Sequence, residues 1–186
     1  MINIAINDKR LKVKEGKTIL EVSADIGIKI PTLCFHKELT PYGACRLCLV
    51  EIITGENNGL EAACVYKVTE GLVIKTDTEK VKKTRRIIFE LLLARSPESE
   101  KLKALAAEYG VEKTRIKLND ETNCLNCGLC VRVCAEIAGR EAINFAWRGV
   151  KRRVQTPFDR LSDFCIGCGA CKYICPIDKI EIKENF

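Results

Sequence analysis

Hydrophobic and polar residues alternate at the start of the chain. Isoleucine occupies every second position from Ile2 to Ile6, which is the period of a half-buried β-strand. The segment Asn7-Asp8-Lys9 predicts a turn, and Leu11 and Val13 continue the alternation. The first 13 residues therefore predict two strands joined by a tight turn.

A helix and further strands are expected after this pair. Thr18 stands three residues before Glu21, a capping-box pattern that predicts a helix start, and Gly27 is a plausible stop. Residues 28–48 lack periodicity and contain two prolines, so we expect a loop. Apolar runs at 49–53 and 71–74 predict further strands. This order of elements suggests a β-grasp arrangement for residues 1–78.

The spacing becomes helical between residues 79 and 123. Val81, Ile88 and Leu92 recur at helix-face intervals. The basic residues of this helix are expected on other faces: Lys82, Lys83, Arg85 and Arg86. A second helix is predicted with Ser96 as N-cap and Pro97 at its first position, ending near Gly110. The stretch has no cysteine, and we interpret it as a helical connector.

Composition points to metal binding. The chain has 186 residues with 12 cysteines and one histidine, and residues 124–186 hold eight of those cysteines. The N-terminus has no apolar signal-peptide core, and no stretch approaches the ~18 apolar residues that span a bilayer. We therefore expect a cytoplasmic chain without direct membrane insertion, in which thiols bind metal rather than form disulfides. The last segment is expected to fold around its metal sites.

The spacing C-x2-C-x2-C-x3-C occurs twice in residues 124–186, and it is the signature of bacterial two-cluster ferredoxins. In that signature the fourth cysteine, expected at a helix start, ligates the other cluster. One predicted 4Fe–4S ligand set is Cys124, Cys127, Cys130 and Cys175. The other is Cys165, Cys168, Cys171 and Cys134. Gly128, Gly167 and Gly169 fit, because glycine lets the backbone approach a cluster closely.

Two alternatives to clusters stay open for these eight cysteines. One is a pair of zinc sites, although zinc ribbons use two separated C-x2-C knuckles rather than four closely grouped thiols. The other is a set of buried structural thiols or disulfides. The doubled motif favours 4Fe–4S clusters.

A third ligand set is predicted near the N-terminus. It consists of Cys34, Cys45, Cys48 and Cys64. The set shares the central C-x2-C and the distant fourth cysteine of plant-type 2Fe–2S ferredoxins, but its first loop is longer. A zinc site or unmetallated thiols are the alternatives here. His36 is more plausibly a hydrogen-bonding loop histidine than a ligand.

The net charge gives little support for nucleic-acid binding. The formal charge of +6 counts every thiol as neutral. Each cluster with four thiolates carries a charge of about −2, so three clusters would cancel the excess. Lys82–Arg86 and Lys151–Arg153 are the only basic runs suited to a DNA-binding regulator, and such runs are more often solvated or docking faces.

Four stretches of the chain resemble a known family. They are PTLCFHKELTPYGACRLCLVEI, AACVYKVTEGLVIKTDTEKV, KKTRRIIFELLLARSPES and, near the end, CLNCGLCVRVCAEIAGREAINFAWRG to CIGCGACKYICPIDKI. They are similar to the N-terminal part of the large iron–sulfur subunit of NADH dehydrogenase (complex I). The diaphorase small subunit of NAD-linked hydrogenases, the N-terminal regions of iron-only hydrogenases and subunits of NAD-linked formate dehydrogenases match too. The resemblance implies a 2Fe–2S cluster at Cys34, Cys45, Cys48 and Cys64.

One departure from the family stands out. Most relatives carry a histidine and three cysteines after the LLLA-type helix, and these ligate an additional 4Fe–4S cluster. Here the stretch reads ARSPESEKLKALAAEYGV, without histidine or cysteine. We therefore expect that cluster to be missing, which leaves one 2Fe–2S and two 4Fe–4S clusters.

The sequence predicts an electron-transfer subunit without catalytic residues. It has no GxGxxG motif for NAD or flavin and no acid–base or nucleophile constellation. The resemblance implies an FMN-containing, NAD(P)H-binding flavoprotein partner. It also implies a further redox subunit of hydrogenase, formate dehydrogenase or ferredoxin–NADP oxidoreductase type. Ferredoxin and electron bifurcation enter by analogy, and a free-standing polyferredoxin is the alternative function.

The predicted fold class is α+β in three parts. Residues 1–78 form a β-grasp 2Fe–2S ferredoxin-like domain, and residues 79–123 form the helical connector. Residues 124–186 form a bacterial-type ferredoxin-like domain with two 4Fe–4S clusters.

Overall fold

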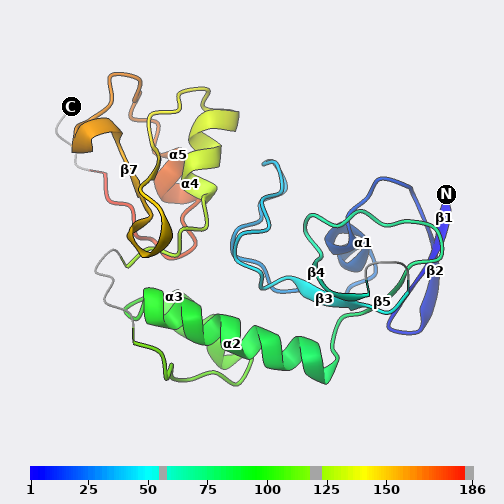
Figure 1. Cartoon of the computed structure of the whole chain (residues 1–186). Coiled ribbons are helices and arrows are strands. Elements are labelled where there is room, and N and C mark those ends of the chain that lie inside the picture. The colour runs from blue at the N-terminus through cyan, green and yellow to red at the C-terminus, as the bar shows by residue number, and fades with distance from the viewer. Residues whose placement is uncertain (55–57, 118–122, 183–186) are drawn as a thin grey trace. The chain divides into compact units, whose positions relative to one another are not determined.

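The computed structural model describes residues 1–54, 58–117 and 123–182. The chain divides into two compact units. The first comprises residues 1–33 and 41–89, and the second comprises residues 34–40 and the chain from residue 90 onward. Strands and helices occur in both units (Figure 1), which confirms the predicted α+β class.

The first unit contains a five-stranded mixed sheet with the order β2-β1-β5-β3-β4. Its strands are β1 (Ile2–Ile6), β2 (Lys9–Val13), β3 (Leu49–Ile52), β4 (Gly59–Ala62) and β5 (Val73–Lys75). The β1–β5 pair is parallel and the other pairs are antiparallel. The prediction missed β4 and placed the last strand two residues too early, because Gly71 lies in a left-handed turn before β5.

The predicted hairpin at the N-terminus is present. β1 and β2 pair with Ile2 opposite Val13 and Ile6 opposite Lys9. Asn7 and Asp8 join them with φ angles of 48° and 69°. Asn and Asp tolerate this left-handed conformation, which two-residue turns need to match the twist of the strands. The three isoleucines of β1 are buried, as their alternation predicts.

The predicted capping box begins helix α1 (Ile19–Asp25). The Thr18 hydroxyl accepts a hydrogen bond from the Glu21 N–H at 3.2 Å, and a Glu21 carboxylate oxygen accepts one from the Thr18 N–H at 2.7 Å. The helix ends before Gly27, whose φ is 76°. Ile19, Leu20 and Val22 are buried within the first unit, and Figure 1 shows the helix on one side of the sheet.

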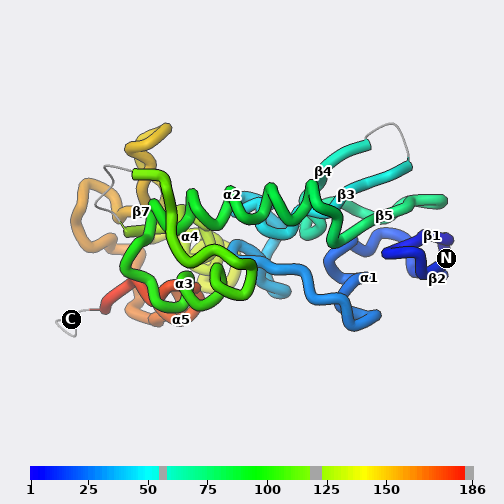
Figure 2. Tube along the Cα trace, turned by 90° about the horizontal axis from the view of Figure 1, so that it is seen from below, coloured from blue at the N-terminus to red at the C-terminus, as the bar shows by residue number. Residues whose placement is uncertain are grey.

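Helix α2 (Glu79–Arg95) covers the predicted range, but its buried face differs from the prediction. Val81, Arg85 and Phe89 are buried at intervals of four residues, whereas Ile88 is only half-buried. The prediction that Arg85 lies on a solvated face is therefore wrong. Figure 2 shows α2 along its length.

Helix α3 (Glu100–Ala107) begins three residues later than predicted, with Ser99 rather than Ser96 as its N-cap. The Ser99 hydroxyl accepts a hydrogen bond from the Leu102 N–H at 3.2 Å. Ser96 instead closes α2, because its N–H donates to the Leu92 carbonyl at 2.9 Å. Its hydroxyl contacts the Asn123 carbonyl at 3.4 Å, so it is engaged elsewhere.

The rest of the second unit consists of short elements. They are α4 (Leu129–Arg132), η1 (Val133–Ile137), β6 (Asn144–Ala146), η2 (Gly149–Lys151), β7 (Arg153–Gln155), η3 (Pro157–Asp159) and α5 (Ala170–Tyr173). Here η1 is a π-helix, and η2 and η3 are 3-10 helices. β6 and β7 form an antiparallel hairpin.

Candidate metal centres

Four cysteines from two separate segments line one cavity of the second unit. The cavity has a volume of about 360 Å³. Its cysteines are Cys124, Cys127, Cys130 and Cys175. Apolar residues on both sides of them, including Leu125 and Ile177, complete the wall together with Arg153 and Lys179. The structure thus brings together the four residues of the first predicted 4Fe–4S set.

The thiols of this cavity crowd one another. Burial raises the pKa of Cys130 to about 12, together with the smaller effect of the negative charges of Cys127, Cys124 and Cys175. Four negatively charged thiolates cannot lie together in a buried cavity unless positive charge is placed between them. Iron ions supply that charge when they displace the thiol protons, so the donor set fits a cluster.

The backbone around these cysteines is shaped by left-handed residues. Asn126 and Gly128 have φ angles of 51° and 75°, and α4 begins directly after Gly128. The turn directs the Asn126 N–H to the Cys124 sulfur at 3.5 Å. The Lys179 N–H donates to the Cys175 sulfur at 3.3 Å. Hydrogen bonds of this kind to ligand sulfurs tune the potential of a cluster.

Three cysteines of the second predicted set lie near one another. Burial raises the pKa of Cys171, and the charges of Cys134 and Cys168 add to that effect because both lie near it. Cys134 is thus close to the second motif although the first motif contains it. Cys165 is half-buried, and its N–H donates to the Ser162 carbonyl at 2.8 Å.

The fourth cysteine of neither motif begins a helix, contrary to the prediction. Cys134 lies inside η1, and Cys175 follows the end of α5 at Tyr173. The short helices begin instead just before the third cysteines, since Gly128 and Gly169 adopt left-handed conformations that start α4 and α5. Both glycines, like Gly167, have positive φ angles, which explains glycine at these positions.

Three cysteines of the N-terminal set lie in the first unit. The sulfur atoms of Cys48 and Cys64 are 3.3 Å apart. Their hydrogen bond lowers the pKa of Cys48 against the opposing effects of burial and of the Cys45 charge. Cys34 is buried and belongs to the second unit. All twelve cysteines are among the described residues, and none forms a disulfide.

Three arginines, Arg85, Arg95 and Arg132, donate hydrogen bonds to backbone carbonyls at or next to predicted ligand cysteines. In the first unit, Arg85 donates to the carbonyls of Leu47 and Leu49, on either side of Cys48. In the second unit, Arg95 donates to the Cys124 carbonyl at 2.6 Å. These contacts could not be predicted from the sequence, because nothing distinguishes a helical arginine that binds a carbonyl from one that lies in solvent.

The third of these arginines binds the segment that carries Cys34. Arg132 donates to the carbonyls of Cys34 and Thr40, both at 2.5 Å. The Thr40 N–H in turn donates to the Glu136 carboxylate at 2.7 Å. Residues 34–40 are therefore fastened to α4 and η1, the helices that contain Cys130 and Cys134.

His36 lies in the same segment. It is exposed, and its Nδ1 accepts a hydrogen bond from the Glu38 N–H at 3.3 Å. This is the local loop contact that the sequence suggested for it.

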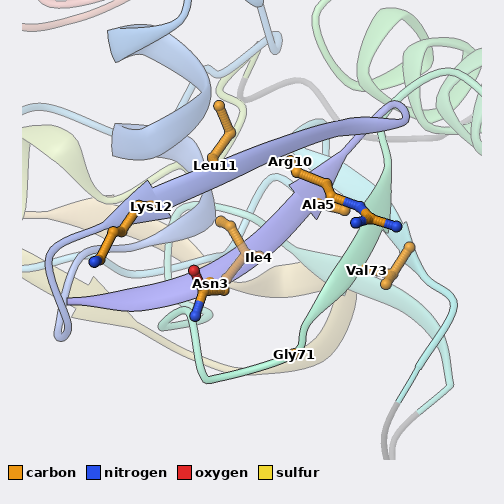
Figure 3. A pocket seen from close by; sticks show the side chains of 8 residues that line it. All are labelled: Asn3, Ile4, Ala5, Arg10, Leu11, Lys12, Gly71 and Val73. Carbon is orange, nitrogen blue, oxygen red and sulfur yellow. The ribbon is translucent and has the colours of Figure 1, made fainter.

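A second cavity, of about 530 Å³, lies over β1, β2 and the segment before β5 (Figure 3). Arg10 and Lys12 contribute basic groups to its wall, and no cysteine lines it. Figure 3 shows the Leu11 side chain directed away from that of Lys12, as expected for neighbours on a strand. The cavity is separate from the cysteine sets.

Two features are absent from the parts of the chain that the structure describes. None of the helices in those ranges combines the length and the hydrophobicity of a membrane span. Within the same ranges, no group of three or more His, Cys, Asp or Glu side chains is placed to hold a single metal ion.

Family models match both ends of the chain. Residues 1–79 match a 2Fe–2S iron–sulfur cluster binding domain, and residues 118–182 match a 4Fe–4S dicluster domain. The predicted cofactor classes are therefore confirmed: a 2Fe–2S site and two 4Fe–4S sites.

Curated relatives match nearly the whole chain. An NADH-quinone oxidoreductase subunit of Rhizobium meliloti is 31% identical over 95% of this chain and 23% of its own length. The alpha subunit of the NADPH-Fe(3+) oxidoreductase of Geobacter sulfurreducens is 34% identical over 98% of this chain and 24% of its own length. The NADH-ubiquinone oxidoreductase 75 kDa subunit of Reclinomonas americana is 29% identical over 98% of this chain and 30% of its own length. This chain thus spans only about a quarter of the length of these relatives.

A solved structure shares the fold. A chain of an NAD+-reducing [NiFe]-hydrogenase, crystallised in the H2-reduced state, superposes with a TM-score of 0.82 at 27% identity. The match covers 95% of this chain and 85% of that one. The predicted resemblance is therefore confirmed: the chain combines a 2Fe–2S cluster binding domain with a 4Fe–4S dicluster domain and is homologous to subunits of NADH-quinone oxidoreductases and to a chain of an NAD+-reducing hydrogenase.

Proposed function

We propose that the chain is a non-catalytic subunit that conducts electrons between an NAD(P)H-linked flavoprotein and a second redox subunit. The observation that carries this proposal is the cavity lined by cysteines from both ferredoxin motifs. Cys175 joins it from 45 residues beyond Cys130. Four cysteines from distant parts of the chain around one cavity are expected for the ligands of a metal cluster rather than for four unrelated thiols.

The proposed ligand sets follow the two motif types. One 2Fe–2S cluster is held by Cys34, Cys45, Cys48 and Cys64. One 4Fe–4S cluster is held by Cys124, Cys127, Cys130 and Cys175, and the other by Cys165, Cys168, Cys171 and Cys134. When bound, such clusters accept and release single electrons. The protein itself contributes burial, hydrogen bonds to sulfur and fixed charges, which set the potentials.

The proposed partners follow from the relatives. The relatives' names mention NADH, NADPH and hydrogenase activity, whereas the sequence of this chain contains no dinucleotide-binding motif. We propose an FMN-containing, NAD(P)H-binding partner and a further subunit of hydrogenase, formate dehydrogenase or ferredoxin–NADP oxidoreductase type. Ferredoxin as a further partner and electron bifurcation belong to the same proposal. Twelve cysteines suit the reducing cytoplasm, where we place the complex.

A free polyferredoxin is the second candidate, and the surface of the second unit argues against it. Seven large apolar side chains between residues 147 and 173 are more than half exposed: Trp147, Val150, Phe158, Leu161, Phe164, Ile166 and Tyr173. Tryptophan is usually well buried, but Trp147 is 69% exposed. Exposed apolar side chains in this number favour a surface that another subunit covers.

Purification of the tagged chain from its native cells without oxygen tests the proposal. We expect a flavin-containing polypeptide in stoichiometric amount, and bleaching of the cluster absorbance by NADH or NADPH. The chain made alone should be reduced by dithionite but not by either nucleotide. A monomer that purifies without a flavoprotein would contradict the proposal and support the free carrier.

A further inference from the structure

Arg85 is a buried cation beside a predicted cluster ligand. Arg85 is only 5% exposed, although it lies on the long helix α2. Its Nε donates to the Leu47 carbonyl at 3.1 Å, and its Nη2 donates to the Leu49 carbonyl at 2.6 Å. A single guanidinium therefore bridges the two residues that flank Cys48.

These contacts complete the hydrogen bonding of a short stretch of backbone. The carbonyl of Cys48 itself accepts a hydrogen bond from the Ala63 N–H at 3.1 Å, next to Cys64. Three consecutive carbonyls are thus held, two of them by Arg85. Because the backbone cannot rotate freely there, the direction of the Cα–Cβ bond of Cys48 is fixed. The fixed backbone thus helps to keep the Cys48 sulfur close to the Cys64 sulfur, which lies 3.3 Å away.

The charge of Arg85 requires compensation. A guanidinium stays protonated in proteins, and burial of a charge is costly unless other groups offset it. Two carbonyl dipoles offset part of the cost. A 2Fe–2S core with four thiolates carries a charge of about −2, which would offset more.

We propose that Arg85 is a positioning residue for the 2Fe–2S cluster, and that its buried positive charge raises the reduction potential of that cluster. This inference rests on the 2Fe–2S assignment made under the proposed function. Reduction adds one electron and takes the cluster from about −2 to about −3. A fixed cation nearby in a weakly screened interior stabilises the more negative state.

Three variants separate the effect of Arg85 on the position of the ligand backbone from the effect of its charge on the reduction potential. Arg85→Met removes both the charge and the bridge. Arg85→Lys keeps the charge, but its single ammonium lacks the planar fork that spans two carbonyls. Arg86→Met is the matched control, because Arg86 is the next residue of α2 and is exposed. The two 4Fe–4S clusters of each variant serve as an internal reference.

The first measurement is a redox titration of the 2Fe–2S EPR signal in the full chain. Arg85→Met is expected to lower the equilibrium constant for reduction at least about tenfold, which is about 59 mV for a one-electron couple. Arg85→Lys and Arg86→Met should stay within about threefold of the unaltered protein, or about 28 mV. The potentials of the 4Fe–4S clusters should not move in any variant.

The second measurement is the rate at which a chelator removes iron from the 2Fe–2S cluster. Loss of a group that orients a ligand typically weakens metal binding ten- to a hundredfold, so both Arg85 variants should release iron faster by about that factor. Arg86→Met should match the unaltered protein. If Arg85→Met assembles no cluster, the comparison of Arg85→Lys with Arg86→Met decides.

Two results would overturn the inference. One is an Arg85→Met protein whose 2Fe–2S potential equals that of Arg86→Met. The other is an Arg85→Lys protein that loses iron no faster than the control. If the unaltered protein itself shows no 2Fe–2S signal, the ligand assignment of the proposed function fails instead.

Discussion

Single residues set the surroundings of each cysteine in this chain through two kinds of hydrogen bond. Backbone N–H groups point at the sulfurs of Cys124 and Cys175, where they stabilise negative charge. Arginine side chains instead bind backbone carbonyls and so orient the cysteines indirectly. The first kind acts on the charge of a ligand, and the second acts on its position. Substitutions at single residues can separate the two effects.

The exchange of fourth cysteines between the ferredoxin motifs is tested by paired substitutions. Cys124→Ser with Cys175→Ser removes two ligands of one predicted cluster, and it should leave about 6 of about 10 iron atoms. Cys124→Ser with Cys134→Ser removes one ligand from each cluster, and it should leave about 2. Iron analysis and Mössbauer spectra of the two proteins give the answer. If the Cys124→Ser, Cys175→Ser protein instead kept about 2 iron atoms and the Cys124→Ser, Cys134→Ser protein kept about 6, each motif would hold its own cluster.

Arg95 offers a test of indirect positioning at the first 4Fe–4S site. Its Nε contacts the Cys124 carbonyl at 2.6 Å and its Nη2 contacts the Arg152 carbonyl at 3.1 Å. Arg95→Met should speed chelator-driven loss of that cluster about ten- to a hundredfold, because the ligand loop loses its anchor. Arg148→Met removes an exposed arginine of the same unit and should have no effect. Equal rates in the two variants would show that the anchor is dispensable.

At the scale of elements, local signals predicted what local contacts determine. The turn at Asn7–Asp8 and the capping box at Thr18 are both present, because their hydrogen bonds and backbone angles depend on residues a few positions apart. The start of α3 was mispredicted because the Ser96 hydroxyl is engaged by Asn123, which is distant in sequence. β4 was missed because Gly59–Ala62 lacks the β-branched alternation of a typical strand.

The capping box provides a prediction about local stability. Thr18→Ala removes the hydroxyl that accepts the Glu21 N–H, which should destabilise α1 by about 1 kcal/mol. Hydrogen exchange of the amides in α1 should accelerate roughly fivefold, since that energy corresponds to a factor of about five. Thr18→Ser keeps the hydroxyl and should exchange at nearly the original rate. Unchanged exchange in Thr18→Ala would mean that packing alone holds the helix.

At the scale of the whole molecule, the cysteine spacing carried most of the functional prediction. Cluster ligation constrains spacing so strongly that the motifs indicated the cofactor classes, while the resemblance of longer stretches indicated the family, and the comparisons confirm both. The buried arginines were not predictable, since a basic residue on an amphipathic helix is usually solvated. The three-part division at residues 78 and 123 stays a prediction, as do the individual ligand sets.

The central claim is that one chain holds three clusters, and metal analysis tests it most directly. Protein purified without oxygen should contain about 10 iron and about 10 sulfide per chain. After reduction with dithionite, EPR should show one 2Fe–2S signal together with interacting 4Fe–4S signals. About 8 iron with no 2Fe–2S signal would contradict the claim, because Cys34, Cys45, Cys48 and Cys64 would then hold no cluster.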